Sequence, residues 1–239
     1  MLHDRLRVRG GPPPGPGRIV LAVMAKVPAT GAVKTRLCPP LTLPQAAGLA
    51  RCFLQDRVDQ LLTLDGADAL VAFAPSEREA ELAALLPARV RRVAQAGPDL
   101  GARLDRLLTD LLAEGYVGAA AVDADSPTLP SDYLREACRH LRGGAVDVVI
   151  GPSEDGGYYL IGLRAPAPAL FRDIEWSTPT VLDETLARAR RLGLRLALLP
   201  PWFDVDRGED LARLRRHEPA DPAPFRPLRT LAFLAAEGL

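Results

Sequence analysis

Short apolar runs alternate with longer amphipathic stretches along most of this chain of 239 residues. The runs have the length of strands, and in the stretches between them apolar residues recur at helical spacing. The clearest helix is expected over residues 99–114, where the repeating residues are Leu100, Leu104, Leu107, Leu108, Leu111 and Leu112. Strands separated by helices predict a mainly parallel sheet, joined by right-handed crossovers, in a three-layer α/β/α fold.

The expected strands cover residues 19–25, 69–74, 89–94, 117–122, 147–150, 158–163 and 195–199. The expected helices cover residues 43–64, 77–86, 99–114, 131–141, 178–192, 208–215 and 228–236. Thr178 is expected to be the N-cap of its helix, with Pro179 in the first turn. We expect one domain over residues 18–216, a flexible leader over 1–17, and a C-terminal tail with a short helix over 217–239.

Composition excludes several classes of protein. Lys and Arg together number 30, as do Asp and Glu, and this neutrality argues against a nucleic-acid binder. No run of about eighteen apolar residues suits a membrane helix, and the N-terminus lacks the apolar centre of a signal peptide. The three cysteines, Cys38, Cys52 and Cys138, suit free thiols in a reducing cytosol, so a cytoplasmic protein is expected.

A cationic loop follows the first expected strand. Lys26, Lys34 and Arg36 lie within eleven residues, together with Gly31, and no acid lies between them. In an open α/β sheet, ligands bind where parallel strands end. The segment Lys34-Thr35-Arg36 therefore favours binding of a phosphorylated small molecule over a plain solvated loop. The Walker pattern GxxxxGK[ST] and the dinucleotide pattern GxGxxG are both absent.

Two pairs of acids follow later strands. Asp123 and Asp125 end the fourth strand, and strand alternation predicts that both point to one side. Carboxylates this close repel each other unless a cation such as Mg²⁺ or Mn²⁺ lies between them, although one could instead cap a helix. Asp204 and Asp206 repeat the pattern. There a capping box with Asp206 at the N-cap and Glu209 at N3 is favoured, and it is compatible with metal binding.

The turn at residues 154–157, Glu-Asp-Gly-Gly, joins two expected strands. Paired glycines permit positive φ or a close approach of a ligand to the backbone. Tyr158 and Tyr159 follow the turn and could stack on a sugar or base, or pack into the core. No histidine is placed as a general base, and the serine hydrolase pattern GxSxG is absent.

Five of these segments resemble, in order, the DUF2064 proteins, a bacterial family of GT-A-like transferases. They are MAKVPATGAVKTRL at 24–37, Asp-Ser-Pro at 125–127, GPSEDGGYYLIGL at 151–163, Trp-Ser-Thr-Pro at 176–179, and FDVDRGEDL at 203–211. Members are often labelled nucleotide-diphospho-sugar or arsenosugar-type glycosyltransferases. The Lys-Thr-Arg-Leu loop is also similar to that of the phospholactate guanylyltransferases.

The resemblance implies a GT-A fold with a nucleotide-binding half and an acceptor-binding half. It implies that the cationic loop, with Lys26, Lys34 and Arg36, meets the phosphates of a donor. It also implies that Asp125 is the main metal ligand, partnered by Asp206 or Asp204. Asp155, Gly156 and Gly157 would line the acceptor side.

Two positions depart from the family pattern. Asp123 stands where the family commonly has Gly, and Arg207-Gly208 stands where it tends to have Thr-Pro. Asp123 is therefore a candidate ligand without a family counterpart. Helix initiation leans more on Asp206, which competes with a metal role for that residue.

The expected activity is transfer of a group from a nucleotide-activated donor to a small-molecule acceptor, with Mg²⁺ or Mn²⁺. Glycosyl transfer ranks first, with Asp155 or Glu154 as the base that takes a proton from the acceptor hydroxyl. Nucleotidyl transfer ranks second, since a phosphate nucleophile needs no base. A non-catalytic nucleotide-binding module is the third alternative. Self-association into a homo-oligomer is left open.

Overall fold

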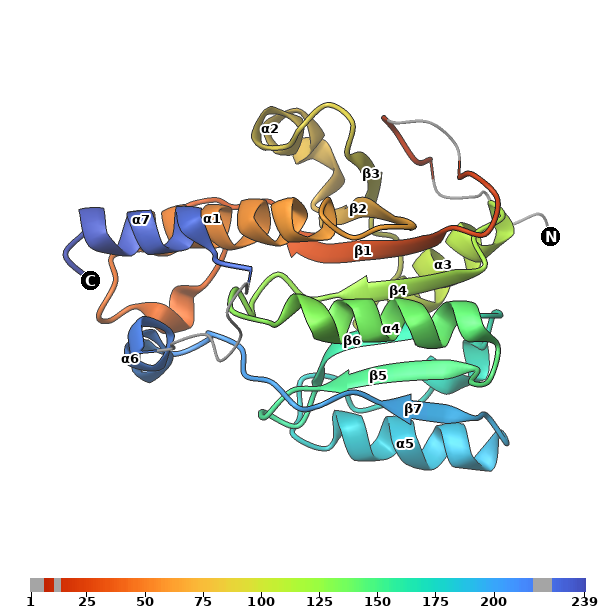
Figure 1. Cartoon of the computed structure of the whole chain (residues 1–239). Coiled ribbons are helices and arrows are strands. Elements are labelled where there is room, and N and C mark those ends of the chain that lie inside the picture. The colour runs from red at the N-terminus through yellow and green to blue at the C-terminus, as the bar shows by residue number, and fades with distance from the viewer. Residues whose placement is uncertain (1–6, 11–13, 217–224) are drawn as a thin grey trace.

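Seven strands form a single sheet in the computed structural model of the chain, which describes residues 7–10, 14–216 and 225–239 (Figure 1). The strands are β1 Ile19–Lys26, β2 Ala67–Ala74, β3 Arg91–Ala94, β4 Gly118–Val122, β5 Val148–Pro152, β6 Tyr158–Leu163 and β7 Leu196–Leu198. Their order is β3-β2-β1-β4-β6-β5-β7. β6 runs antiparallel to β4 and β5, and the other neighbours are parallel, so the expected mainly parallel sheet is confirmed.

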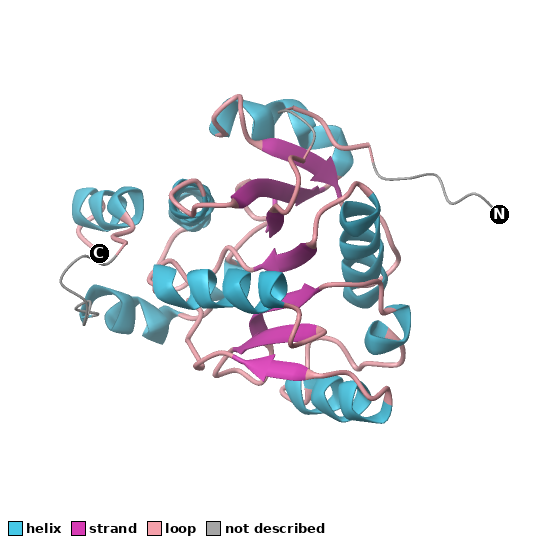
Figure 2. Ribbon diagram, turned by 45° about the vertical axis from the view of Figure 1, so that its right-hand side comes forward, coloured by secondary structure: helices cyan, strands magenta, loops and turns pink. Residues whose placement is uncertain are grey.

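Helices cover both faces of the sheet (Figure 2). The α-helices are α1 Leu43–Leu61, α2 Glu79–Leu85, α3 Leu100–Ala113, α4 Ser131–Gly143, α5 Val181–Arg191, α6 Gly208–Arg216 and α7 Leu228–Ala236, of which α6 and α7 pack beside α1. α1, α2 and α4 pack into the core on one face, and α3 and α5 pack into the core on the other. The three-layer architecture is therefore confirmed. None of the helices in the described part of the chain is both long and apolar enough to cross a membrane.

The central strands are apolar throughout because both of their faces are buried. In β1, Ile19, Leu21 and Val23 enter one core, while Val20 and Ala22 enter the other. β1 to β4 are all parallel, so their carboxyl ends meet at one edge of the sheet. The loops that follow β1, β3 and β4 leave from this edge, which places the cationic loop close to Asp123 and Asp125.

The C-terminal helix docks against the domain. In α1, the buried carboxylate of Asp56 accepts hydrogen bonds from the backbone N–H groups of Arg229 (3.1 Å) and Thr230 (2.8 Å). An acid at this position satisfies the first amides of α7 and complements its dipole. Of the expected leader and tail, residues 1–6, 11–13 and 217–224 lie outside the described residues.

One helix start is wrong in the sequence-based prediction. α5 begins at Val181, and its N-cap is Thr180 instead of Thr178. The hydroxyl of Thr178 donates to the carbonyl oxygen of Glu175 at 2.7 Å. The chain is still turning at Ser177, where φ is 66°, so residues 176–179 form a loop and not a first turn.

Candidate active site

A cavity of about 470 Å³ opens at the carboxyl ends of β1, β3 and β4. Its wall brings together residues that are distant in the sequence: Lys26, Lys34, Arg36, Gln95, Asp125 and Asp206. Thr35 and Arg103 of α3 also line it. Residues of the cationic loop and two of the expected acids, Asp125 and Asp206, therefore share this edge of the sheet, while Asp123, Asp204 and Asp155 are not among the lining residues.

Lys34 is the centre of this group. Its side chain is 6% exposed, and its ammonium donates to the carbonyl oxygen of Val205 at 2.7 Å. Nζ lies 3.1 Å from Oδ1 of Asp125 and 3.6 Å from Oδ1 of Asp206. Burial opposes the charge, but Asp125 and then Asp206 outweigh it, so the pKa of Lys34 is raised overall and the ammonium stays charged.

The backbone of Lys34 is in the left-handed region, with φ 49° and ψ 32°. This conformation costs a residue with a side chain roughly 1–2 kcal/mol. It turns the chain directly into a short 3₁₀ helix, Thr35–Leu37, whose Leu37 is buried. The loop is thus anchored by an apolar residue on one side and by the ion pairs of Lys34 on the other.

Asp206 also forms an ion pair with Arg36, another cation of the loop. Oδ2 of Asp206 lies 3.0 Å from Nη1 of Arg36, whose side chain is 70% exposed beside the cavity. The expected capping box with Glu209 is wrong. The backbone N–H groups of Asp206 and Arg207 donate instead to Asp210, at 3.0 and 2.7 Å. The Asp206 carboxylate is directed at Lys34 and Arg36, which offer stronger, charge-assisted contacts.

Asp123 and Asp125 have different partners. The side chain of Asp125 is 48% exposed and pairs with Lys34. Asp123 accepts from the hydroxyl of Ser126 (2.6 Å) and lies 3.4 Å from Nη2 of Arg57. Burial raises the pKa of Asp123 to about 7 in spite of Arg57. Strand alternation does not extend to these residues, because β4 ends at Val122.

Arg57 is a site residue that the sequence reasoning missed. Its side chain, on α1, is fully buried, and Nη2 donates to the carbonyl oxygen of Ser126 at 2.6 Å. Gln60, which accepts from Nη1 of Arg57, donates in turn to the carbonyl oxygen of Leu129 at 2.7 Å. These bonds hold the turn that presents Asp125. The available signal was the position of Arg57, which shares the buried face of the helix with Phe53, Leu54 and Leu61.

Three more expected acids, Asp204, Asp155 and Glu154, are not among the residues that line the cavity. Asp204 has its pKa raised to about 6 by burial and by the nearby carboxylates of Asp155 and Asp125. Asp155 accepts from the N–H of Gly157 at 2.9 Å. Glu154 forms two hydrogen bonds with Arg213, at 2.5 and 2.8 Å, which lower its pKa. Of the two expected bases, Asp155 is therefore the one not held by an arginine.

The glycines and tyrosines of this turn have structural roles. A Cβ on Gly156 would lie 2.0 Å from the carbonyl oxygen of Pro179, and φ is 90° there, so no other residue fits. Tyr159 is buried in the core and its hydroxyl donates to the carbonyl oxygen of Pro200 at 3.0 Å. Tyr158 packs against the core on the other face of the sheet. Both tyrosines therefore pack, as the packing interpretation expects, and Tyr159 is too buried to stack on a sugar or base.

The carboxylates fit a hard divalent cation only in part. Oxygens of Asp125 and Asp206 converge on one point, now taken by the Lys34 ammonium, and Asp206 is 35% exposed. Among the described residues, no three His, Cys, Asp or Glu side chains are grouped as a metal site. The donor set therefore suits Mg²⁺ or Mn²⁺ bound by one or two carboxylates, with the remaining ligands from water and substrate phosphates.

The family described as "Uncharacterized protein conserved in bacteria (DUF2064)" matches residues 57–178, about half of the chain. A solved structure from Desulfovibrio desulfuricans G20, named "putative nucleotide-diphospho-sugar transferase", is 32% identical, with a TM-score of 0.85 over 92% of this chain and 95% of that one.

This chain belongs to the DUF2064 family.

More distant solved structures share the fold. CMP:2-keto-3-deoxy-manno-octonic acid synthetase, in complex with CTP, is 14% identical, with a TM-score of 0.54. 4-Diphosphocytidyl-2C-methyl-D-erythritol synthase is 16% identical, with a TM-score of 0.55. Each alignment covers 83% of this chain and 97% of the other. The GT-A-like, Rossmann-like fold expected of this DUF2064 protein is confirmed by these structures.

A curated protein from Streptomyces avermitilis, named "Probable DNA ligase", is 44% identical over 68 residues. The matched segment is 28% of this chain and spans 13% of that protein.

Proposed function

We propose that this DUF2064 protein is a transferase that uses a nucleotide-activated donor, whose phosphates bind in the cavity beside Lys34 and Arg36. The observation that carries the proposal is the contact of the Lys34 ammonium with Asp125 and Asp206. A cation held by two carboxylates beside an exposed arginine suits a site for both a phosphate chain and a metal. The name of the Desulfovibrio relative supports the same class of substrate.

In this proposal, charge on the leaving phosphate is stabilised by groups already in position. Arg36 presents a guanidinium fork that matches phosphate oxygens, and Lys34 adds a buried positive charge. Lys26, Thr35 and the loop at Gly31, where φ is 75°, complete the phosphate side. A Mg²⁺ or Mn²⁺ ion held by Asp125 and Asp206 would neutralise further charge on the donor's phosphates. Asp204 and Asp123 are close enough to Asp125 to interact with it electrostatically, and they are further candidate ligands.

Glycosyl transfer is favoured by two further acids, Asp155 and Asp204. The carboxylate of Asp155 lies close enough to Asp204 to raise the pKa of Asp204. This acidic side would repel a phosphorylated acceptor and admit a neutral hydroxyl. Asp155 would take the proton of that hydroxyl as its oxygen bonds to the sugar, and the nucleoside diphosphate would leave with the bonding electrons. Gly156 and Gly157 would line the acceptor space.

Nucleotidyl transfer is the second candidate, and the Lys34-Thr35-Arg36 loop supports it. In that reaction a phosphate of the acceptor attacks a nucleoside triphosphate and pyrophosphate leaves. The cations of the loop suit a triphosphate at least as well as a diphosphate. The three cysteines are free thiols, which suits either reaction in a reducing cytosol.

A donor panel with Mg²⁺ or Mn²⁺ tests the proposal. We expect release of a nucleoside diphosphate from one nucleotide sugar in the presence of an acceptor. Pyrophosphate release from one nucleoside triphosphate would instead support nucleotidyl transfer. Binding of nucleotides without turnover of any donor would contradict both reactions and support a non-catalytic module. Arg190→Gln, an exposed change on α5, is the control variant and is expected to leave turnover unaffected.

A further inference from the structure

A second cavity, of about 410 Å³, lies at the outer edge of the sheet, beside β3. Its walls come from the N-terminal segment 7–10, the end of β2, α2, β3 and α3. Four arginines line it: Arg7, Arg9, Arg92 and Arg106. The chain as a whole is neutral, so this concentration of positive charge is local.

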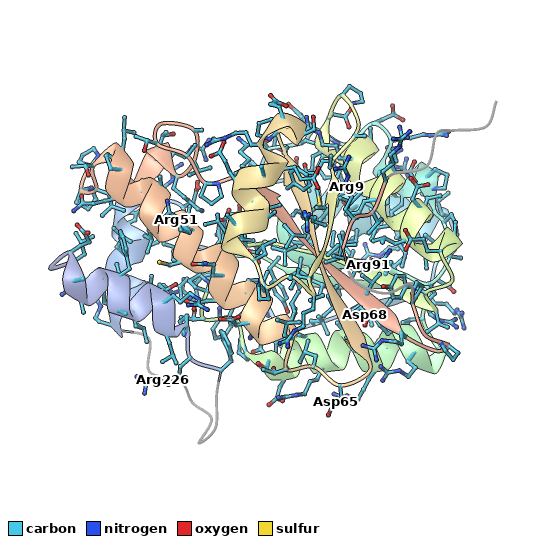
Figure 3. All side chains as sticks on the ribbon, turned by 90° about the horizontal axis from the view of Figure 1, so that it is seen from above. Arg9, Arg51, Asp65, Asp68, Arg91 and Arg226 are labelled. Atoms are coloured by element: carbon cyan, nitrogen blue, oxygen red, sulfur yellow. The ribbon has the colours of Figure 1, made fainter. Side chains whose placement is uncertain are left out.

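The N-terminal segment builds the cavity by pairing with the edge strand. The N–H of Arg9 donates to the carbonyl oxygen of Arg92 at 2.8 Å, and the reverse bond is 2.9 Å. In Figure 3, Arg9 marks this segment and Arg91 marks β3. Arg9 and Arg92 are thus directly opposite each other in an antiparallel bridge. Like charges in such a pair are destabilising.

Glu79 of α2 offsets part of that repulsion. Its carboxylate lies 3.1 Å from Nη1 of Arg9 and 3.2 Å from Nε of Arg92. Among the described residues that line this cavity, Glu79 is the one acid, against four guanidinium groups. Arg106 also has Asp110 at 3.8 Å, a long ion pair on α3. The cavity therefore keeps a surplus of positive charge.

We propose that this second cavity binds a small organic molecule that carries phosphate groups. One guanidinium group can donate two parallel hydrogen bonds to a phosphate. Arginines from a loop, a strand and a helix can therefore reach several phosphate oxygens at once. The volume is in the range of small-molecule sites. Phe73, Val93 and Ala94 give one apolar wall for the organic part, and Ser76 adds a hydroxyl.

The site adjoins the first cavity. Gln95 lines both, and its side-chain amide donates to the carbonyl oxygens of Ala72 (2.8 Å) and Ala25 (3.3 Å). On α3, Arg103 lines the first cavity, and Arg106, one turn later, lines the second. A ligand in the second cavity would thus contact the wall of the first. Its binding does not depend on which reaction occurs there.

Titration calorimetry with fructose 1,6-bisphosphate and with inorganic pyrophosphate tests this site. The titrations use full-length protein that carries Lys34→Ala and Arg36→Ala, which remove two of the three cations of the cationic loop. We expect the bisphosphate to bind more tightly than pyrophosphate. Arg92→Gln should weaken its binding about tenfold, through loss of one charge-assisted contact, and Glu79→Gln should tighten it several-fold, through loss of the competing acid. Arg190→Gln should change nothing.

The opposite signs separate a ligand site from a structural role. Both Arg92→Gln and Glu79→Gln break the same ion pair, so a purely structural cluster would respond to both in the same direction. That result, or binding of pyrophosphate alone, would overturn the proposal. If the double-variant background fails to fold, hydrogen exchange on wild-type protein replaces it. Protection of residues 7–10 and 91–96 by the bisphosphate is then expected, and its absence would contradict the site.

Discussion

At the scale of the residue, Lys34 joins three parts of the chain that the sequence separates widely. Its ammonium connects the loop after β1, the turn after β4 and the segment before α6 through Asp125, Val205 and Asp206. The buried ammonium of Lys34 can stay charged because the two carboxylates offset the cost of its desolvation. The same arrangement keeps the ammonium at a fixed position, which is what stabilisation of a leaving phosphate requires.

Replacing Lys34 by Ala should therefore affect turnover more than folding. We expect the rate to fall by about two orders of magnitude or more, the effect of losing one charge-stabilising contact at such a site. Steady-state kinetics with the donor found in the panel, together with thermal melting, would measure both effects. A rate near that of the wild type, in a variant that folds, would remove Lys34 from the catalytic machinery.

Arg57 should act on stability and activity together. Arg57→Met removes the bonds to Ser126 and Asp123, and we expect a loss of about 3 kcal/mol in the free energy of unfolding. Turnover should fall as well, because the turn that carries Asp125 loosens. Urea denaturation would measure the loss. Adding Asp123→Asn to Arg57→Met should recover part of the stability, and a further decrease would contradict the pairing.

At the scale of the element, two glycines distinguish the cost of a positive φ from the cost of a steric clash. Gly31 has φ 75°, and a Cβ added there would have no neighbour within 4 Å, so Gly31→Ala should cost about 1 kcal/mol. Gly156 has φ 90° and Pro179 in contact, so Gly156→Ala should cost more than about 3 kcal/mol. Denaturation of the two variants tests this. Equal losses would show that Pro179 does not restrict the residue at position 156.

The approach to β7 depends on one carboxylate. Asp147 accepts three hydrogen bonds from Arg195, through its backbone N–H (2.9 Å), Nε (3.0 Å) and Nη2 (2.7 Å), and these lower its pKa to about 2. A lowered pKa stabilises the fold above the unfolded value near 4, and this contribution disappears as the pH falls towards 2. Asp147 is about one-third exposed, so solvent screening reduces the contribution to about 1 kcal/mol.

Asp147→Asn should thus lower the free energy of unfolding by about 1 kcal/mol at pH 7 and by almost nothing at pH 2. Denaturant titrations across this range would measure the difference. Asp132→Asn, which breaks an exposed pair with Arg135 on α4, is the matched control and should cost less than about 0.5 kcal/mol. A pH-independent difference for Asp147→Asn would contradict the ion pair.

The elements themselves were largely predictable from the sequence, and the contacts of single side chains were not. Apolar runs and helical spacing located the strands and helices, because burial imposes that pattern on the chain. Strand alternation predicted that Asp123 and Asp125 point to one side. Alternation no longer sets side-chain direction past the end of a strand, and the two residues have different partners. Asp210 took the capping role expected of Glu209 because Asp206 had stronger partners, Lys34 and Arg36.

At the scale of the whole molecule, polar groups divide between the two ends of the sheet. At the amino ends of the strands, Tyr116 donates to Asp68 (3.0 Å) and accepts from Arg91 (2.8 Å), in a hydrogen-bonded network that includes the labelled Asp68 and Arg91 of Figure 3. At the carboxyl ends, Lys34, Arg36 and Asp125 stand around an open cavity. The first end stabilises the fold, and the second is available to a ligand.

Long-range pairings at this scale were beyond sequence reasoning. Helical spacing places Arg57 on the buried face of α1, but it does not identify the turn after β4 as the partner of Arg57. The pairing of residues 7–10 with β3 was likewise not foreseen, because a stretch expected to be a flexible leader carries no strand signal. The contacts of Lys34 with Asp125 and Asp206 could not be predicted without the three-dimensional structure. What the sequence supplied was the chemistry of these residues and the edge of the sheet where they meet.

The most direct measurement is nucleotide binding with and without Mg²⁺, by calorimetry, to the wild type, Asp125→Asn and Lys34→Ala. The probes are the nucleotide sugars UDP-glucose and GDP-mannose and the nucleoside triphosphates UTP and GTP. We expect at least one of them to bind the wild type about tenfold or more tightly with Mg²⁺, and each variant to lose this gain. Nucleotide binding that is unchanged by Mg²⁺ and by both substitutions would contradict a phosphate and metal site at Lys34, Asp125 and Asp206.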